Sequence, residues 1–112
     1  MLSMKVVRTQ DFERPAAQGI FATPILDGDH SNVRIIRLAP GQALPPHRHG
    51  VSDLLLYSVT GEGELDVPAG AVAFNAGSLA FYHGDEELRV RNTGTTDLTL
   101  LAFLAPKFAA SA

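Results

Sequence analysis

The stretch Gly41-Gln42-Ala43-Leu44-Pro45-Pro46-His47-Arg48-His49-Gly50 holds the side chains of this sequence that are best spaced for chemistry. Residues two apart on an extended chain point to the same face, roughly 6.5–7 Å apart. His47 and His49 are therefore expected to point inward together, with Arg48 outward. Two neutral imidazoles on one strand make half of a site for a divalent transition metal, and the two prolines before them stiffen the approach.

Short apolar segments lie on both sides of this stretch, separated by turns rich in Gly, Pro, Asn and Asp. Their spacing of about 8–12 residues, without a convincing helical period, predicts an all-β sandwich or barrel. Residues 9–15 are expected to form a polar connection with one helical turn, and residues 105–112 to fray. The expected strands are residues 4–7, 20–22, 33–38, 53–60, 64–67, 71–74, 79–82, 88–92 and 98–104.

Length and composition narrow the function classes. A chain of 112 residues predicts one domain over residues 1–112. The net charge of -3, with acidic and basic residues interspersed, indicates neither a nucleic-acid partner nor a membrane surface, so the expected partner is a small molecule or a protein. Without cysteine, any metal must be held by His, Asp or Glu. No apolar run approaches the roughly 20 residues of a membrane helix, and a cytoplasmic location is expected.

Two of the expected strands, residues 53–60 and 98–104, are apolar on both faces. Such strands need cover on both sides of the sheet. Either the N-terminal segment or a second subunit could supply it. A homodimer is favoured, because two-fold dimers are the commonest homo-oligomers.

Residues 33–104 resemble the cupin superfamily, which implies a double-stranded β-helix, or jelly-roll, barrel with a site at its mouth. The first motif of that family is Gly, five residues, His-x-His, three or four residues, Glu, six residues, Gly. Gly41, His47-Arg48-His49 and Gly61 reproduce its frame, and residues 77–92 echo the second motif. At the positions where the family has its metal-binding Glu and third His, this chain has Leu54 and Leu88.

A register one residue earlier would place carboxylates, Asp53 and Glu87, at these two positions. A slip of one residue reverses the face that every side chain occupies. Leu88 and Val90 alternate with two arginines, and arginines inside a narrow apolar barrel would be costly. The alternation therefore favours the register with leucines inside.

Two functions remain open. The first is a metal-free binding module that holds a small, partly apolar molecule, and the leucine replacements favour it. The second is an enzyme of the isomerase or oxygenase type with one divalent metal (Zn, Ni, Mn or Fe) on His47 and His49, and Asp53 or His83 as a third ligand. The intact His-x-His favours this one. The residues expected to line the pocket are His47, His49, Leu54, Leu56, Phe81, Leu88 and Val90.

Overall fold

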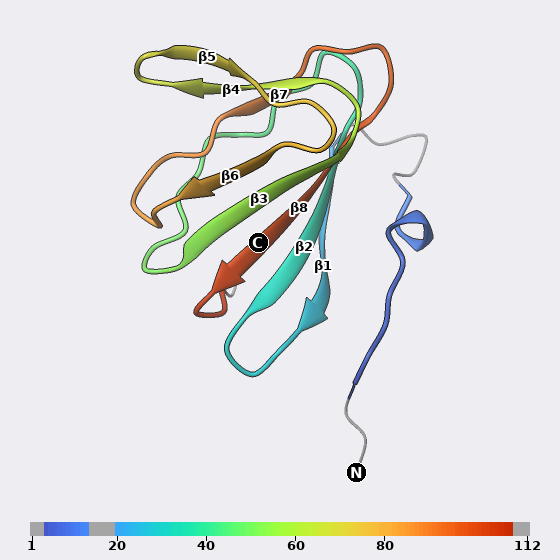
Figure 1. The fold of residues 1–112 in the computed structure, drawn as a ribbon, viewed down its shortest axis with the longest axis vertical. Coiled ribbons are helices and arrows are strands. Elements are labelled where there is room, and N and C mark those ends of the chain that lie inside the picture. Colours follow the sequence, from blue (N-terminus) through green and yellow to red (C-terminus); the bar gives the residue numbers. More distant parts are fainter. Residues whose placement is uncertain (1–3, 14–19, 109–112) are drawn as a thin grey trace.

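The computed structural model describes residues 4–13 and 20–108. Its strands form two antiparallel sheets that face one another, and the described residues contain no α-helix (Figure 1). The all-β prediction is thus confirmed. None of the described helices is long and apolar enough to span a membrane. The elements are η1 (Thr9–Asp11), β1 (Phe21–Asp27), β2 (Asn32–Leu38), β3 (Asp53–Thr60), β4 (Gly63–Val67), β5 (Gly70–Ala73), β6 (Leu79–Tyr82), β7 (Val90–Asn92) and β8 (Leu98–Ala105).

The larger sheet has the order β1-β2-β8-β3-β6, and the smaller sheet has the order β5-β4-β7. β8, the last strand in the chain, lies between β2 and β3 and ties the early part of the chain to the middle. Residues 39–52 connect β2 to β3 of the larger sheet and pass along the edge of the smaller sheet on the way. The bridges Ala43↔Arg91 and His47↔Leu88 attach this connection alongside β7, so the histidine stretch acts as an irregular fourth strand of the smaller sheet.

Side chains of alternate residues on the strands fill the space between the two sheets. On β3, Leu54 and Leu56 are fully buried, whereas Leu55 between them is 52% exposed. Leu88 is also fully buried, while Asp53 is exposed. The register that places leucines inside is therefore confirmed. Each fully buried leucine stabilises the fold by roughly 1.5–3 kcal/mol.

The structure explains why the first motif ends in a glycine, which is Gly61 directly after β3. Gly61 has φ +93°, and a Cβ there would stand 2.6 Å from the carbonyl oxygen of Asp97. Both the backbone conformation and the close approach of the β7–β8 loop require glycine at this turn.

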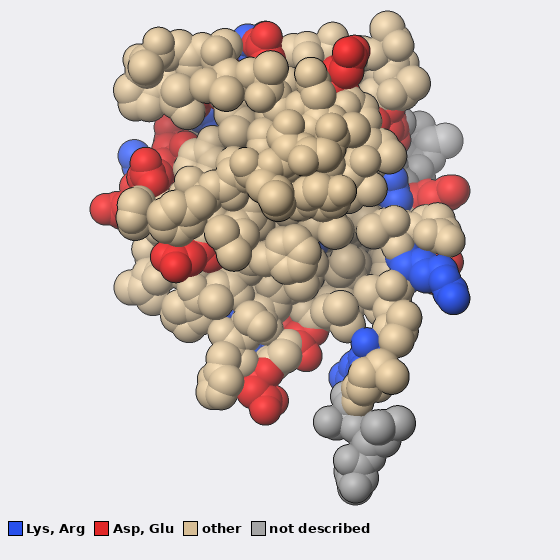
Figure 2. Space-filling view, in the orientation of Figure 1, with Lys and Arg blue, Asp and Glu red and all other residues tan. Residues whose placement is uncertain are grey.

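The outer face of the larger sheet remains apolar. Leu55 lies between Phe81 on β6 and Phe103 on β8, and these side chains are 52%, 50% and 38% exposed. The N-terminal segment is held at Arg37 of β2, whose guanidinium donates to the carbonyl oxygens of Thr9 and Phe12. The homodimer expected from this apolar face stays a prediction. On the side of the molecule that Figure 2 shows, charged side chains lie mainly around the margins, and Lys and Arg form no stripe.

Two end segments differ from expectation. Residues 4–7 form no strand, whereas the expected helical turn is present as η1. Residues 105–108 do not fray. The side-chain amide of Asn32 donates to the Phe108 carbonyl at 2.9 Å and accepts from its N–H at 3.3 Å, and the Ser52 hydroxyl donates to the Pro106 carbonyl at 2.7 Å. These bonds replace the strand partners that the segment lacks. Residues 109–112 lie outside the described residues.

Candidate functional site

The histidine stretch is fixed through its backbone. His47 and Leu88 exchange two hydrogen bonds, with N···O distances of 3.4 and 2.9 Å, and the His49 N–H donates to the Gly84 carbonyl at 2.8 Å. Pro45 and Pro46 have no N–H to donate, so regular pairing cannot continue through them. Both imidazoles are thereby presented from a short, firmly attached segment.

The two imidazole rings lie edge to face, with centroids 4.6 Å apart. His47 Nδ1 is 3.0 Å from the Pro45 carbonyl oxygen. Because a carbonyl only accepts, this Nδ1 carries the proton, and Nε2 is the free nitrogen of the neutral ring. His49 is only 4% exposed, and its Nδ1 has no hydrogen-bond partner among the described residues. Burial, followed by the nearby His47 and Arg34, lowers the pKa of His49 from 6.5 to about 4, so its ring is neutral at pH 7.

A cavity of about 350 Å³ opens beside these rings. Its wall is mostly apolar, and the described residues contribute no Asp or Glu to it. The Phe108 ring forms part of it and packs against the His49 ring, with centroids 5.1 Å apart. The lining residues are Ala22, Arg34, Ile36, Leu44, His47, Arg48, His49, Leu88, Ala102, Leu104 and Phe108.

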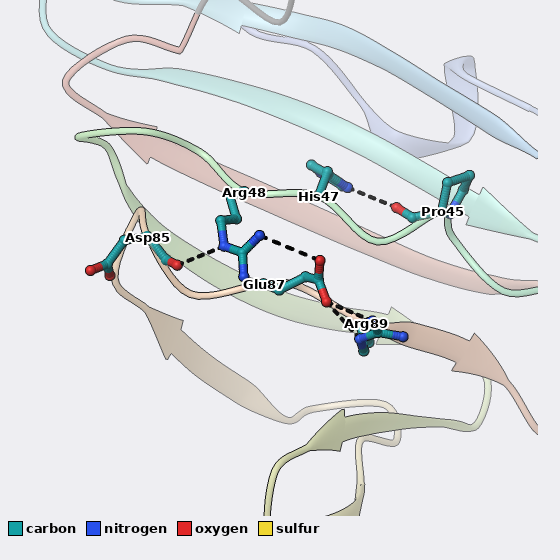
Figure 3. Close-up of polar contacts among 6 residues, drawn as sticks. All are labelled: Pro45, His47, Arg48, Asp85, Glu87 and Arg89. Carbon is teal, nitrogen blue, oxygen red and sulfur yellow. Dashed lines mark hydrogen bonds and ion pairs between the residues drawn. The ribbon is translucent and has the colours of Figure 1, made fainter.

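Arg48 turns away from His47, as the alternation predicts (Figure 3). Its Nε donates to the Asp85 carbonyl oxygen at 2.9 Å, and its Nη1 lies 3.6 Å from the Glu87 carboxylate. Glu87 also accepts from Arg89 at 2.7 Å. The charge of Arg48 is thus compensated outside the cavity.

Arg34 is the functional candidate that the sequence did not reveal. It lies on β2 opposite Ala102 of β8, is half-buried and lines the cavity. Among the described residues, no side chain or carbonyl forms an ion pair or hydrogen bond with it. Ile35 and Ile36 are apolar on opposite faces of this strand, so alternation alone could not assign Arg34 to the inside. Only Leu38, four residues later and therefore on the same face of the strand as Arg34, indicates from the sequence that Arg34 points inward.

The predicted pocket residues separate into three groups. His47, His49 and Leu88 line the cavity. Leu54, Leu56 and Val90 are buried in the core. Phe81 lies on the outer face instead, because Tyr82 takes the inward position on β6.

The two proposed third ligands lie apart from the imidazole pair. Asp53 is exposed, and His83 is exposed on its own loop with Nδ1 2.9 Å from the Glu86 carboxylate, a hydrogen bond that raises the pKa of His83. No three His, Cys, Asp or Glu side chains of the described residues are grouped so that they could hold a metal ion. With Leu54 and Leu88 fully buried where the family has ligands, the donor set does not fit a resident metal of that kind.

A second hollow, of about 450 Å³, lies on the other side of Arg48. Tyr82 lines it, and the buried hydroxyl of this residue has no partner among the described residues. Two of its carboxylates already have partners: Glu86 accepts a hydrogen bond from His83, and Glu87 pairs with Arg89. The cavity at the imidazole pair, with an apolar wall and an unpaired guanidinium, is therefore the candidate site.

Comparisons with known proteins agree with the fold. The family model of the cupin domain matches residues 34–104. A Thermotoga maritima protein named oxalate-binding protein is 31% identical over 78 residues, which cover 67% of this chain and 64% of that protein. The chain thus matches less than two thirds of that relative's length.

Two solved structures have the same architecture. A Klebsiella pneumoniae protein with a double-stranded β-helix domain superposes with a TM-score of 0.82 at 19% identity, covering 93% of this chain and 91% of the other. A Thermotoga maritima protein described as a predicted oxalate decarboxylase gives a TM-score of 0.75 at 25% identity, covering 91% and 99%. The predicted double-stranded β-helix is confirmed.

Proposed function

The chain belongs to the cupin family, and we propose that it binds a small molecule in the barrel-mouth cavity centred on His47 and His49. The observation that carries the proposal is the cavity itself: about 350 Å³ of mostly apolar wall, onto which two imidazoles converge. Small-molecule sites are typically concave and apolar, with a few placed polar groups. The cavity has these properties.

The unpartnered Nδ1 of His49 supports the same proposal. A buried polar atom without a partner costs about 1–3 kcal/mol. A bound molecule that donates to this atom or accepts from it would recover that energy. The likeness to an oxalate-binding protein also supports a small-molecule ligand.

The alternative is a metal-dependent enzyme, and the convergence of the two imidazoles favours it. Two protein ligands hold a divalent ion weakly compared with the three or four of established sites. The leucines at the remaining ligand positions therefore favour metal-free binding.

The test is a thermal-shift screen with a chemically varied panel of small molecules. Ala22 is exposed and lines the cavity, so Ala22→Trp fills the mouth without disturbing the core. Ala73→Trp, at an exposed position of β5, is the matched control. Compounds that raise the Tm of the wild type and of the control, but not of Ala22→Trp, support the proposal. If no compound raises the Tm, or all raise it equally in Ala22→Trp, the proposal is wrong.

The metal alternative is tested on the same protein after chelation. Zn²⁺, Ni²⁺, Mn²⁺ and Fe²⁺ are added singly to the wild type and to the double variant His47→Ala/His49→Ala. Stoichiometric metal uptake and a raised Tm in the wild type alone would establish the metal-dependent alternative in place of metal-free binding.

A further inference from the structure

Arg34 gives the cavity a positive charge that no other lining side chain compensates. None of the described lining residues is a carboxylate, and the other lining arginine, Arg48, pairs with Glu87 outside. The Arg34 guanidinium has no ion pair or hydrogen bond among the described residues. A guanidinium that loses water without gaining a partner is costly, whereas a planar carboxylate matches its fork of N–H donors. The charge of the cavity therefore favours an anionic ligand.

A second polar group faces the same space. His49 is nine-tenths buried, lines the cavity and has a ring nitrogen without a partner in the described part of the chain. A neutral imidazole always carries one N–H, which can donate to an anion. Burial, followed by the nearby His47 and Arg34, lowers the pKa of His49, so the guanidinium supplies the charge and the imidazole supplies a neutral donor.

The apolar part of the cavity wall determines which group can be attached to the anionic group of the ligand. Leu88, Leu104 and Phe108 offer apolar surface to whatever is attached to the anionic group. At about 30 Å³ per water-sized unit, the cavity holds roughly ten non-hydrogen atoms. A second carboxylate on the same ligand would be pressed against this apolar wall without a second unpaired cation.

We propose that the ligand is a small monocarboxylate that carries a compact apolar group. Its carboxylate binds the Arg34 guanidinium and the His49 N–H, and its apolar group packs on Leu88, Leu104 and Phe108. This inference rests on the proposed function and assigns Arg34 as the residue that determines ligand charge.

The test is calorimetric titration with matched acid and amide pairs: phenylacetate with phenylacetamide, and isovalerate with isovaleramide. Oxalate is the dianionic comparison. Charge-assisted hydrogen bonds are about twice as strong as neutral ones, so at least one acid is expected to bind about tenfold or more tightly than its amide. Oxalate is expected to bind more weakly than that acid.

Variants then isolate the guanidinium. Arg34→Gln should weaken binding of the acid by about tenfold or more and leave the affinity for the amide nearly unchanged, and Arg34→Lys should restore part of the loss. Arg89→Gln, which removes the same charge from an exposed side chain, should behave as the wild type. The Tm of each variant shows that it is folded.

The outcomes separate the two proposals. If amides bind as tightly as acids and Ala22→Trp abolishes both, the cavity binds small molecules but the monocarboxylate inference is wrong. If Arg34→Gln leaves acid binding intact, or if oxalate binds most tightly, the inference is also wrong. If neither acids nor amides bind the wild type at millimolar concentration, the inference is overturned, and the broader panel then decides the proposed function.

Discussion

Acidification should destabilise this protein through His49. In the unfolded chain this histidine binds a proton near pH 6.5, whereas in the fold its pKa is lowered to about 4 by burial, His47 and Arg34. Between these values the unfolded state binds more protons, so stability falls as the pH is lowered through this window. The full difference corresponds to an upper limit of ~3 kcal/mol of stability.

The assay is urea unfolding of the wild type and His49→Gln at a series of pH values from about 7 down to about 4.5. Other groups titrate in both proteins, so the difference between the two curves isolates this histidine. The wild type should lose stability relative to His49→Gln as the pH falls. His83→Gln is the control: the Glu86 hydrogen bond raises the pKa of His83, so its contribution is lost as the pH rises, and removing it should preserve the acid-side loss. Parallel curves for the wild type and His49→Gln would refute the reasoning.

Four further changes test other parts of the structure. Gly84→Ala would place a Cβ 2.1 Å from a carbonyl oxygen of the histidine stretch, and should lower the free energy of unfolding by more than ~2 kcal/mol; an unchanged urea midpoint would contradict this contact. Asn32→Ala removes both hydrogen bonds to Phe108, which should cost about 1–3 kcal/mol and speed amide exchange at that residue; unchanged exchange would refute the anchoring role. Leu88→His adds an imidazole beside the bridge to the histidine stretch, so Zn²⁺ should raise the Tm of the variant more than that of the wild type, and equal shifts would contradict this. Leu55→Glu should convert the expected homodimer into a monomer in sedimentation experiments, whereas a monomeric wild type would show that the dimer prediction is wrong.

Alternation predicted much of the fold because most strands bury one face only. Leu88 and Val90 alternate with arginines, and the structure buries both apolar residues as expected. Alternation does not predict which face points inward on strands that are apolar on both faces. β2 is one of these, which is why Arg34 could not be assigned to the cavity from its neighbours alone.

Long-range contacts account for the other differences. Phe108 lies in a short terminal segment that sequence patterns describe as frayed, yet Asn32, 76 positions earlier, binds its backbone. Phe81 belongs to a strand of only four residues, too short for the sequence to fix which face turns inward. Local patterns contain neither a distant hydrogen-bond partner nor the orientation of so short a strand.

The most direct measurement is a crystal structure of the protein soaked with the acid that binds most tightly in the titrations. The carboxylate is expected within hydrogen-bond distance of the Arg34 guanidinium, with the apolar group between Leu88, Leu104 and Phe108. An acid bound elsewhere, or one whose carboxylate points to solvent while Arg34 stays unpaired, would contradict the account.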